Sequence, residues 1–442
     1  MIVISEEFEK LVLSSIEDLK QMYLDPEDDR DWAIAWSAGK DSTCVTAMTM
    51  KMLESLPNEQ RKRNIHAVMS DTVVENPNLE QYMHGQVKQF TKYIKDKEFP
   101  VTVSLVKRKP TNSYFYLILG RGYFLPQNNG SGRWCTDRLK IKPQNERLAE
   151  INPSYILIGT RLSESTKRRA SIEKWTGMND LSYKIGDHAS LTKSKTFMPI
   201  VDFTIEDVWN YLSKERLPWG SSHAVRTLYR EATGECGFTN PKATEKKAAK
   251  SESCGARFGC WTCPVILNDR STEVMSETHA WMKPLSEWRM LQLKVFGDYI
   301  PVKPQGQKRK ERSEVLRQWR EINKEIKKVS KSGYKRNGKP MVDKTTGEIR
   351  VDQGTITVEA REYLFEELIK TENEVNKIRD EMGLFPLKLI SDEEIHMIKE
   401  MWETDRRDCP HLVTNVNGLS IDYLKELIKR GENIQVHNIE TV

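Results

Sequence analysis

One hexapeptide, Ser37-Ala-Gly-Lys-Asp-Ser42, constrains the fold more than any other stretch of this sequence. It follows a short apolar run, Trp32-Ala-Ile-Ala-Trp36, that predicts a buried strand, and it precedes residues 43–55, whose composition favours a helix. A glycine at such a junction lets the backbone turn tightly, and free N–H groups at a helix start attract anions. The alternative is an ordinary capped turn, but the order of the six residues favours a phosphate-binding loop.

Three further strand candidates follow, each after a helix-length segment: Ile65–Met69, Val101–Val106 and Tyr155–Ile158. Alternation of this kind predicts an α/β fold, a doubly wound and mostly parallel sheet. Ligands of such sheets bind beyond the carboxyl ends of the strands. We therefore expect Asp71 and the segment Gly159-Thr-Arg161 to share a sheet edge with the hexapeptide.

The residues of this edge suggest distinct roles. Lys40 supplies positive charge, Asp41 caps the helix or orients a metal ion, and Arg161 forks two phosphate oxygens. Asp71 holds the adenosine or a magnesium ion, or is simply a turn residue. The predicted nucleotide-binding set is Ser37, Ala38, Gly39, Lys40, Asp41, Ser42, Asp71, Gly159 and Arg161, with Lys40, Asp41 and Arg161 catalytic.

Four of the seven cysteines are candidate metal ligands. Cys254, Cys260 and Cys263 are spaced six and three apart, and a Cys-x-x-Cys-Pro ending is frequent in iron–sulfur proteins. Cys135, from the predicted sheet domain, is the fourth thiolate, and Cys236 competes with it. Spacing alone leaves an iron–sulfur cluster, a zinc site and a redox dithiol open.

Two other cysteines have plainer interpretations. Cys44 falls on the apolar helix after the hexapeptide and is expected to be a small buried hydrophobe, and Cys409 falls in a loop and is unassigned.

The distribution of charge along the chain singles out one basic segment. The net charge is +5, but residues 303–339 hold fourteen Lys and Arg against four Asp and Glu, which indicates either a polyanion-binding arm or a solvated helix.

No long apolar run and no signal-like start are present, so a cytoplasmic location without a membrane span is expected. The 442 residues are divided into a sheet domain (1–200), a helical cysteine-rich region (201–300) and a mainly helical basic region (301–442).

The hexapeptide resembles the Ser-Gly-Gly-Lys-Asp-Ser loop of the N-type ATP pyrophosphatases, with Ala38 in place of a glycine. That superfamily includes the sulfonucleotide reductases, tRNA thiolases and GMP synthetase. The resemblance implies an adenine nucleotide α-hydrolase-like fold and cleavage of ATP between the α- and β-phosphates, with Mg²⁺ as cofactor.

A second resemblance concerns the cysteines. The segment Trp134–Pro143 and the segment Pro199–Tyr211 resemble the sulfonucleotide reductases, and Arg257-Phe-Gly-Cys-Trp-Thr-Cys263 resembles the DndC-type proteins of DNA phosphorothioation systems and their SspD-type counterparts. This implies a [4Fe-4S] cluster on Cys135, Cys254, Cys260 and Cys263. It also implies DNA as substrate, a cysteine desulfurase as sulfur donor and other phosphorothioation subunits as partners, with homo-oligomerisation left open. The alternatives are a sulfonucleotide reductase, a tRNA thiolase and a non-catalytic iron–sulfur DNA-binding subunit.

Overall fold

The computed structural model describes residues 6–127, 132–164, 183–214, 217–233, 259–265, 270–301 and 309–437. The chain forms two compact units. The first comprises Met1–Val73, Pro77–Arg108 and Leu139–Phe258, and the second Val74–Asn76, Lys109–Arg138 and Gly259–Val442. These limits differ from the predicted stretches 1–200, 201–300 and 301–442, because a unit is decided by which elements bury one another's apolar faces and not by their order in the chain.

The first unit is built on a six-stranded sheet in the order β3-β2-β1-β4-β6-β5. Five of these strands are parallel, and β5 pairs antiparallel with β6. The chain winds from β1 out to β3 and then returns to place β4 on the other side of β1. This confirms the predicted α/β fold, a doubly wound and mostly parallel sheet. The strands are β1 Trp32–Ala35, β2 Ile65–Asp71, β3 Val101–Lys107, β4 Tyr155–Leu157, β5 Ile185–Asp187 and β6 Lys195–Phe197.

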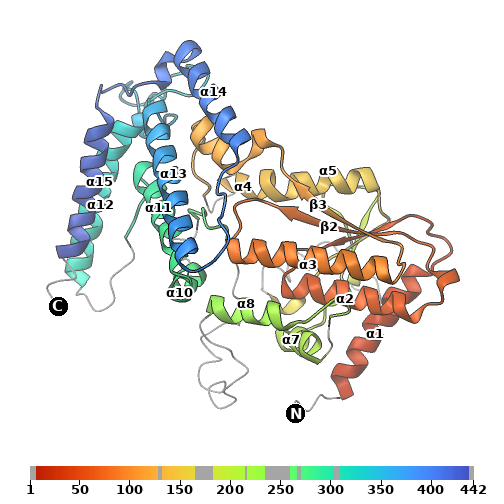
Figure 1. The fold of residues 1–442 in the computed structure, drawn as a ribbon. Coiled ribbons are helices and arrows are strands. Elements are labelled where there is room, and N and C mark those ends of the chain that lie inside the picture. The colour runs from red at the N-terminus through yellow and green to blue at the C-terminus, as the bar shows by residue number, and fades with distance from the viewer. Residues whose placement is uncertain are drawn as a thin grey trace. The chain divides into compact units, whose positions relative to one another are not determined.

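Alternation along the strands divides the core between the two faces of the sheet. Trp32 and Ile34 of β1 belong to a large cluster, whereas Ala33 between them belongs to a small one with Leu148. The large cluster packs against α1, α2, α3, α7 and α8, and α5 covers the opposite face (Figure 1). The helices of this unit are α1 Glu6–Tyr23, α2 Lys40–Ser55, α3 Pro77–Asp96, α5 Lys142–Ile151, α7 Ile205–Lys214 and α8 His223–Thr233.

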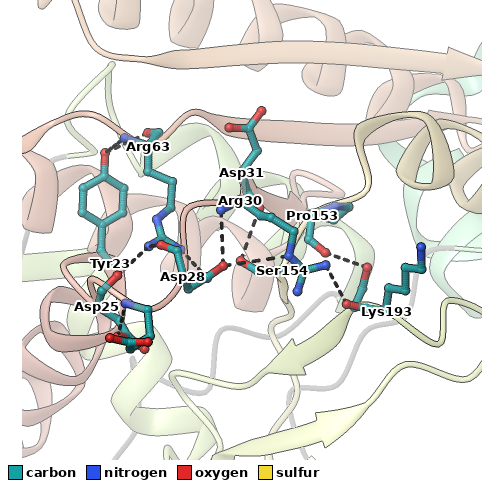
Figure 2. A network of polar contacts seen from close by, with 11 residues as sticks. Tyr23, Asp25, Asp28, Arg30, Asp31, Arg63, Pro153, Ser154 and Lys193 are labelled. Carbon is teal, nitrogen blue, oxygen red and sulfur yellow. Dashed lines mark hydrogen bonds and ion pairs between the residues drawn. The ribbon is translucent and has the colours of Figure 1, made fainter.

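A polar network fixes the amino ends of the central strands (Figure 2). The hydroxyl of Tyr23 lies 2.8 Å from the carbonyl oxygen of Arg63, and the Arg63 guanidinium donates to the carboxylate of Asp28. Burial opposes ionisation of Asp28, but hydrogen bonds from Ser154 and Arg63 outweigh it and lower its pKa. The Ser154 N–H also donates to the Asp31 carbonyl at 2.9 Å, which joins the entries to β4 and β1. These contacts therefore hold the sheet at the amino ends of its central strands, opposite the end that carries the hexapeptide.

The second unit is mainly helical, as predicted for the C-terminal part. Its helices are α4 Trp134–Thr136, α10 Arg270–Thr278, α11 Lys283–Val295, α12 Arg309–Ser330, α13 Val358–Glu381, α14 Asp392–Asp408 and α15 Ile421–His437. Helices α12 and α15 lie side by side (Figure 1), and Gly431 of α15 allows this, because a Cβ there would stand 2.4 Å from the Trp319 ring. None of the described helices has both the length and the apolar character that a membrane crossing needs.

Candidate functional site

The hexapeptide forms a tight loop between β1 and α2. The hydroxyl of Ser42 accepts the N–H of Ser37 at 3.1 Å and donates to the carbonyl of Gly39 at 3.2 Å, so it closes the loop on itself. Ala38 adopts φ 55°, the left-handed region that costs a non-glycine residue roughly 1–2 kcal/mol. The alanine thus stands at a backbone position that favours glycine.

The carboxylate of Asp41 joins two cations. Its Oδ2 lies 2.9 Å from Nζ of Lys40, and its Oδ1 accepts Nε–H of Arg161 at 2.7 Å. The N-cap of α2 is Gly39, with no side-chain cap, so the predicted capping role of Asp41 is wrong. Asp41 is instead the link between the loop and the end of β4.

Arg161 has a different contact from the predicted fork on phosphate oxygens. Its side chain is only 3% exposed, and Nη1 donates to Oγ of Ser163 at 2.9 Å, which in turn donates to the carbonyl of Phe203 at 3.0 Å. The guanidinium is thus engaged with Asp41 and Ser163, and Arg161 holds the carboxylate of Asp41 in place.

Gly159 permits close contact between the end of β4 and the loop. A Cβ at this position would lie 2.7 Å from the carbonyl carbon of Asp41 and 2.7 Å from the nitrogen of Ser42. Both are backbone atoms, so they cannot rotate away as a flexible side chain would. The predicted ligand-binding glycine therefore acts by shaping the loop.

Gly159→Ala should destabilise the protein by about 1–3 kcal/mol, because the added methyl group overpacks this contact. Gly85→Ala is the matched control: Gly85 lies in α3 with nothing within 4 Å of an added Cβ, so alanine there should stabilise by about 0.5–1 kcal/mol. Denaturant midpoints of the two variants measure both effects. A Gly159→Ala protein as stable as the unchanged one would show that the loop shifts without cost.

Tyr229 of α8 is a site residue that sequence reasoning missed. Its hydroxyl accepts the backbone N–H of Lys40 at 3.4 Å, and its ring centroid lies 5.3 Å from Nζ of Lys40. Burial raises the pKa of Tyr229 to about 12; the Lys40 N–H lowers it slightly and Asp41 raises it. The phenol is therefore neutral at neutral pH. Lys40 and Tyr229 are 189 positions apart, so no local sequence pattern could have indicated their contact.

Asp71 lies at the end of β2, as predicted. Its Oδ1 accepts the N–H of Val73 at 2.8 Å, and Val73 has φ 60°, an unusual value for a β-branched residue. Asp71 therefore stabilises the turn after β2, which is one of the roles predicted for it.

Three of the four predicted metal ligands, Cys135, Cys260 and Cys263, belong to the second unit. The expectation that Cys135 comes from the sheet domain is thus wrong: residues 109–138 leave the sheet after β3 and fold with the helical unit. Cys254 and its competitor Cys236 lie outside the described residues.

Tyr114 connects these three cysteines. Burial raises the pKa of the Tyr114 hydroxyl, and the thiols of Cys263, Cys135 and Cys260 raise it further. Burial and the nearby thiol of Cys263 likewise raise the pKa of Cys135. The Tyr114 hydroxyl donates to the carbonyl of Thr262, between Cys260 and Cys263, at 3.2 Å, and its ring stacks with that of Trp134, the neighbour of Cys135.

Helix α11 holds the turn that carries Cys260 and Cys263. The side chain of Gln292 donates to the carbonyl of Thr262 at 2.6 Å, and Nε of Arg289 donates to the carbonyl of Cys263 at 2.6 Å. Within the described residues, the buried Nη2 of Arg289 has no hydrogen-bond partner. A buried cationic donor without a partner is costly, so an anionic group such as metal-bound thiolates fits this site.

The remaining described cysteines match their plainer interpretations. Cys44 is fully buried, and burial raises the pKa of its thiol well above the ordinary value. Cys409 ends α14, where its N–H donates to the carbonyl of Asp405 at 2.9 Å and its Sγ lies 4.0 Å from the carbonyl of Arg336. Cys409 is therefore packed within folded structure.

The positive charge of the basic segment 303–339 is partly neutralised by acidic residues of the second unit. Arg317 of α12 pairs with Glu314 at 2.8 Å and Glu321 at 3.7 Å, and Lys327 pairs with Asp298 at 3.1 Å. Residues 302–308 lie outside the described part of the chain. The described portion of the segment thus presents mixed charges and not a uniformly positive face.

The parallel sheet with a phosphate-type loop at the β1–α2 junction defines a nucleotide-binding α/β domain. Residues 31–266 match the model of the phosphoadenosine phosphosulfate reductase domain, and the chain belongs to that family. The search of curated proteins finds no match.

Solved structures also align with the chain. One is the phosphoadenylyl-sulfate reductase of Candida auris in a phosphate complex, at 13% identity over 50% of this chain and 91% of that chain, with TM-score 0.30. Another is the FMN adenylyltransferase of Candida glabrata, at 11% identity over 53% and 65%, with TM-score 0.30. A third is the U34-tRNA thiolase NcsA of Methanococcus maripaludis with its [4Fe-4S] cluster, at 13% identity over 68% and 84%, with TM-score 0.32.

Proposed function

We propose that this protein is an ATP pyrophosphatase coupled to sulfur transfer, which adenylates a DNA backbone phosphate and helps to replace a non-bridging oxygen with sulfur. The observation that carries the proposal is the occurrence, in one chain of this family, of the Ser37–Ser42 loop and of two cysteine-bearing segments, with Cys135 and with Cys260 and Cys263, that both contact Tyr114. The resemblance of Arg257–Cys263 to DndC-type proteins supplies the acceptor, DNA.

In the first step, a non-bridging oxygen of the DNA phosphodiester attacks the α-phosphorus of ATP. The bond between the α- and β-phosphates breaks, and pyrophosphate leaves with its electron pair. The ammonium of Lys40 and the N–H groups of the loop stabilise the charge that grows on pyrophosphate, while Asp41, held by Arg161, fixes the direction of Lys40. Mg²⁺ bound with the nucleotide would neutralise part of the triphosphate charge.

In the second step, a sulfur nucleophile displaces AMP from the adenylated phosphate. We propose that the sulfur arrives as a persulfide from a cysteine desulfurase partner, and that two electrons from a thiol reductant cleave the remaining sulfur–sulfur bond. Other phosphorothioation subunits and a cytoplasmic setting follow from the same proposal.

Cys135, Cys254, Cys260 and Cys263 would hold a [4Fe-4S] cluster. Such a cluster, with all four irons bound by thiolates, would supply electron transfer. The contribution of this chain is to hold the Cys260–Cys263 turn through Gln292 and Arg289 of α11.

The placement of Cys409 weighs against the sulfonucleotide reductase alternative. Such a reductase needs a mobile, redox-active cysteine near its C-terminus, and Cys409 is the last cysteine of this sequence. It is half-buried and hydrogen-bonded at the end of α14. The tRNA thiolase alternative differs in the acceptor alone, so the acceptor must be tested directly.

Mass spectrometry of nuclease-digested DNA tests the proposal. Cells with the gene should yield dinucleotides in which sulfur replaces one oxygen, and cells without it, or with Lys40→Ala, should yield none. Digested tRNA from the same cells is the control. Thiolated tRNA that depends on the gene, with unmodified DNA, would establish the thiolase alternative. Sulfite release from phosphoadenylyl sulfate would establish the reductase alternative.

A further inference from the structure

A second group of ligand atoms lies at the carboxyl edge of the sheet, in the first unit. Asp71 ends β2, and Glu80 and His84 belong to α3; one ligand atom from each lies within 4.8 Å of the others. Nε2 of His84 is 3.9 Å from Oδ2 of Asp71 and 3.8 Å from Oε1 of Glu80. We propose that these three side chains bind a divalent transition-metal ion, with Mn²⁺ as the best-suited probe.

Local structure explains why the three groups converge. Glu80 and His84 are four residues apart in α3, so they lie on the same face of the helix, one turn apart. The helix begins at Pro77, shortly after the turn that Asp71 stabilises through Val73. The strand end and the first turns of the helix therefore approach each other because the connection between them is short.

The buried carboxylate of Asp71 supplies an independent argument. Its side chain is 2% exposed, and Oδ1 accepts the N–H of Val73. In the described part of the chain no hydrogen bond reaches Oδ2, which faces only His84 and Lys107, each at 3.9 Å. A buried carboxylate oxygen with long ionic contacts alone is poorly compensated, and a bound cation would compensate it.

The donor set selects the kind of ion. Magnesium prefers oxygen ligands with near-ideal octahedral geometry, whereas imidazole with carboxylates suits Mn²⁺, Fe²⁺ or Zn²⁺. Bonds of about 2.1 Å require neighbouring donors about 3 Å apart, so the side chains must close by roughly 1 Å. Glu80 is 31% and His84 45% exposed, which leaves room for water ligands.

In the absence of a metal ion, the ammonium of Lys107 supplies the positive charge near Oδ2 of Asp71. Lys107 ends β3 and pairs with Asp71 in the strand register, but its side chain is 62% exposed and can turn into solvent. Its ammonium competes with the metal for Oδ2 of Asp71. Removal of this charge should therefore strengthen metal binding, whereas removal of a ligand should weaken it.

The site shares the sheet edge with the phosphate loop, because β1 and β2 are adjacent and parallel. The inference does not rest on the proposed function, since it needs neither ATP turnover nor the cysteines.

The test is a titration of the full-length protein with Mn²⁺ alone, without nucleotide, followed by the loss of the free-ion EPR signal. Mn²⁺ is chosen because it has little affinity for the soft cysteine thiolates. His84→Ala changes an exposed side chain, and Asp71→Asn keeps the hydrogen bond to Val73. Since loss of even an outer-shell partner commonly costs ~10–100-fold, each variant should weaken binding by at least ~10-fold.

His66→Ala is the matched control. His66 lies in β2, and its Nε2 is 2.9 Å from Oδ2 of Asp31, the residue before β1, so the two form another histidine–aspartate pair outside the proposed ligand set. It should bind Mn²⁺ as the unchanged protein does, and Lys107→Met should bind more tightly. No Mn²⁺ binding by the unchanged protein, or equal binding by His84→Ala and Asp71→Asn, would overturn the proposal, and equal or weaker binding by Lys107→Met would count against it.

Discussion

Lys40→Ala should lower the rate of pyrophosphate release from ATP by about 10²–10³-fold, because it removes one preorganised group that stabilises charge on the leaving pyrophosphate. The side chain of Lys40 is only partly held, by Asp41 and over the ring of Tyr229, so the fold should survive the change. Lys51→Ala, on the same helix, is the control for a general loss of positive charge. Pyrophosphate release that is equally fast in both variants would remove the basis for the assignment.

Asp41→Asn should affect folding as well as catalysis. The substitution leaves the buried Arg161 without its anionic partner, and breaking a buried ion pair in this way costs about 3–5 kcal/mol. We therefore expect Asp41→Asn to lose both stability and pyrophosphate release, whereas Lys40→Ala loses release alone. Thermal unfolding measured beside the rate assay distinguishes the two cases.

Cys135→Ser should abolish the iron–sulfur centre. Anaerobically purified protein should be brown and contain about four iron and four sulfide per chain, and loss of one thiolate ligand makes such a centre labile. Iron content and visible absorption should fall close to zero for Cys135→Ser, Cys260→Ser and Cys263→Ser.

The other cysteines supply controls. Cys44→Ser and Cys409→Ser should keep the colour, because Cys44 is buried beside Met48 and Cys409 lies at the end of α14. Zinc in place of iron would show that the centre is structural. A protein bleached by Cys236→Ser but not by Cys135→Ser would keep the cluster and replace the fourth ligand.

The sheet was predictable because each of its central strands has a local sequence pattern. Residues 32–36, 65–69, 101–106 and 155–158 are apolar runs, and all four contain or overlap β1 to β4. Strands β5 and β6 escaped prediction because each has three residues and a single large apolar side chain, Ile185 or Phe197. Their pairing depends on neighbours in space, which a local pattern does not contain.

The candidate site was predictable in its residues more than in their contacts. The loop, Gly159 and Arg161 are recognisable because strand ends and turn residues are local features. The Arg161–Asp41 pair joins positions 120 apart, and only the folded chain shows that the guanidinium is already engaged. Likewise, the sequence indicates that Cys135 is a candidate ligand but not that it folds with Cys260 and Cys263.

The carboxylate of Asp41 also bears on which anions the loop can hold. It already engages the ammonium of Lys40 and the guanidinium of Arg161 at the adjacent strand end. A lone sulfate or inorganic phosphate must compete with this internal carboxylate for Lys40, and it brings few contacts with which to do so. A triphosphate reaches the loop N–H groups as well and can displace the pairing. The loop should therefore discriminate against the abundant small anions of the cell, and ATP affinity should change little in sulfate- or phosphate-containing buffers beyond ordinary ionic screening.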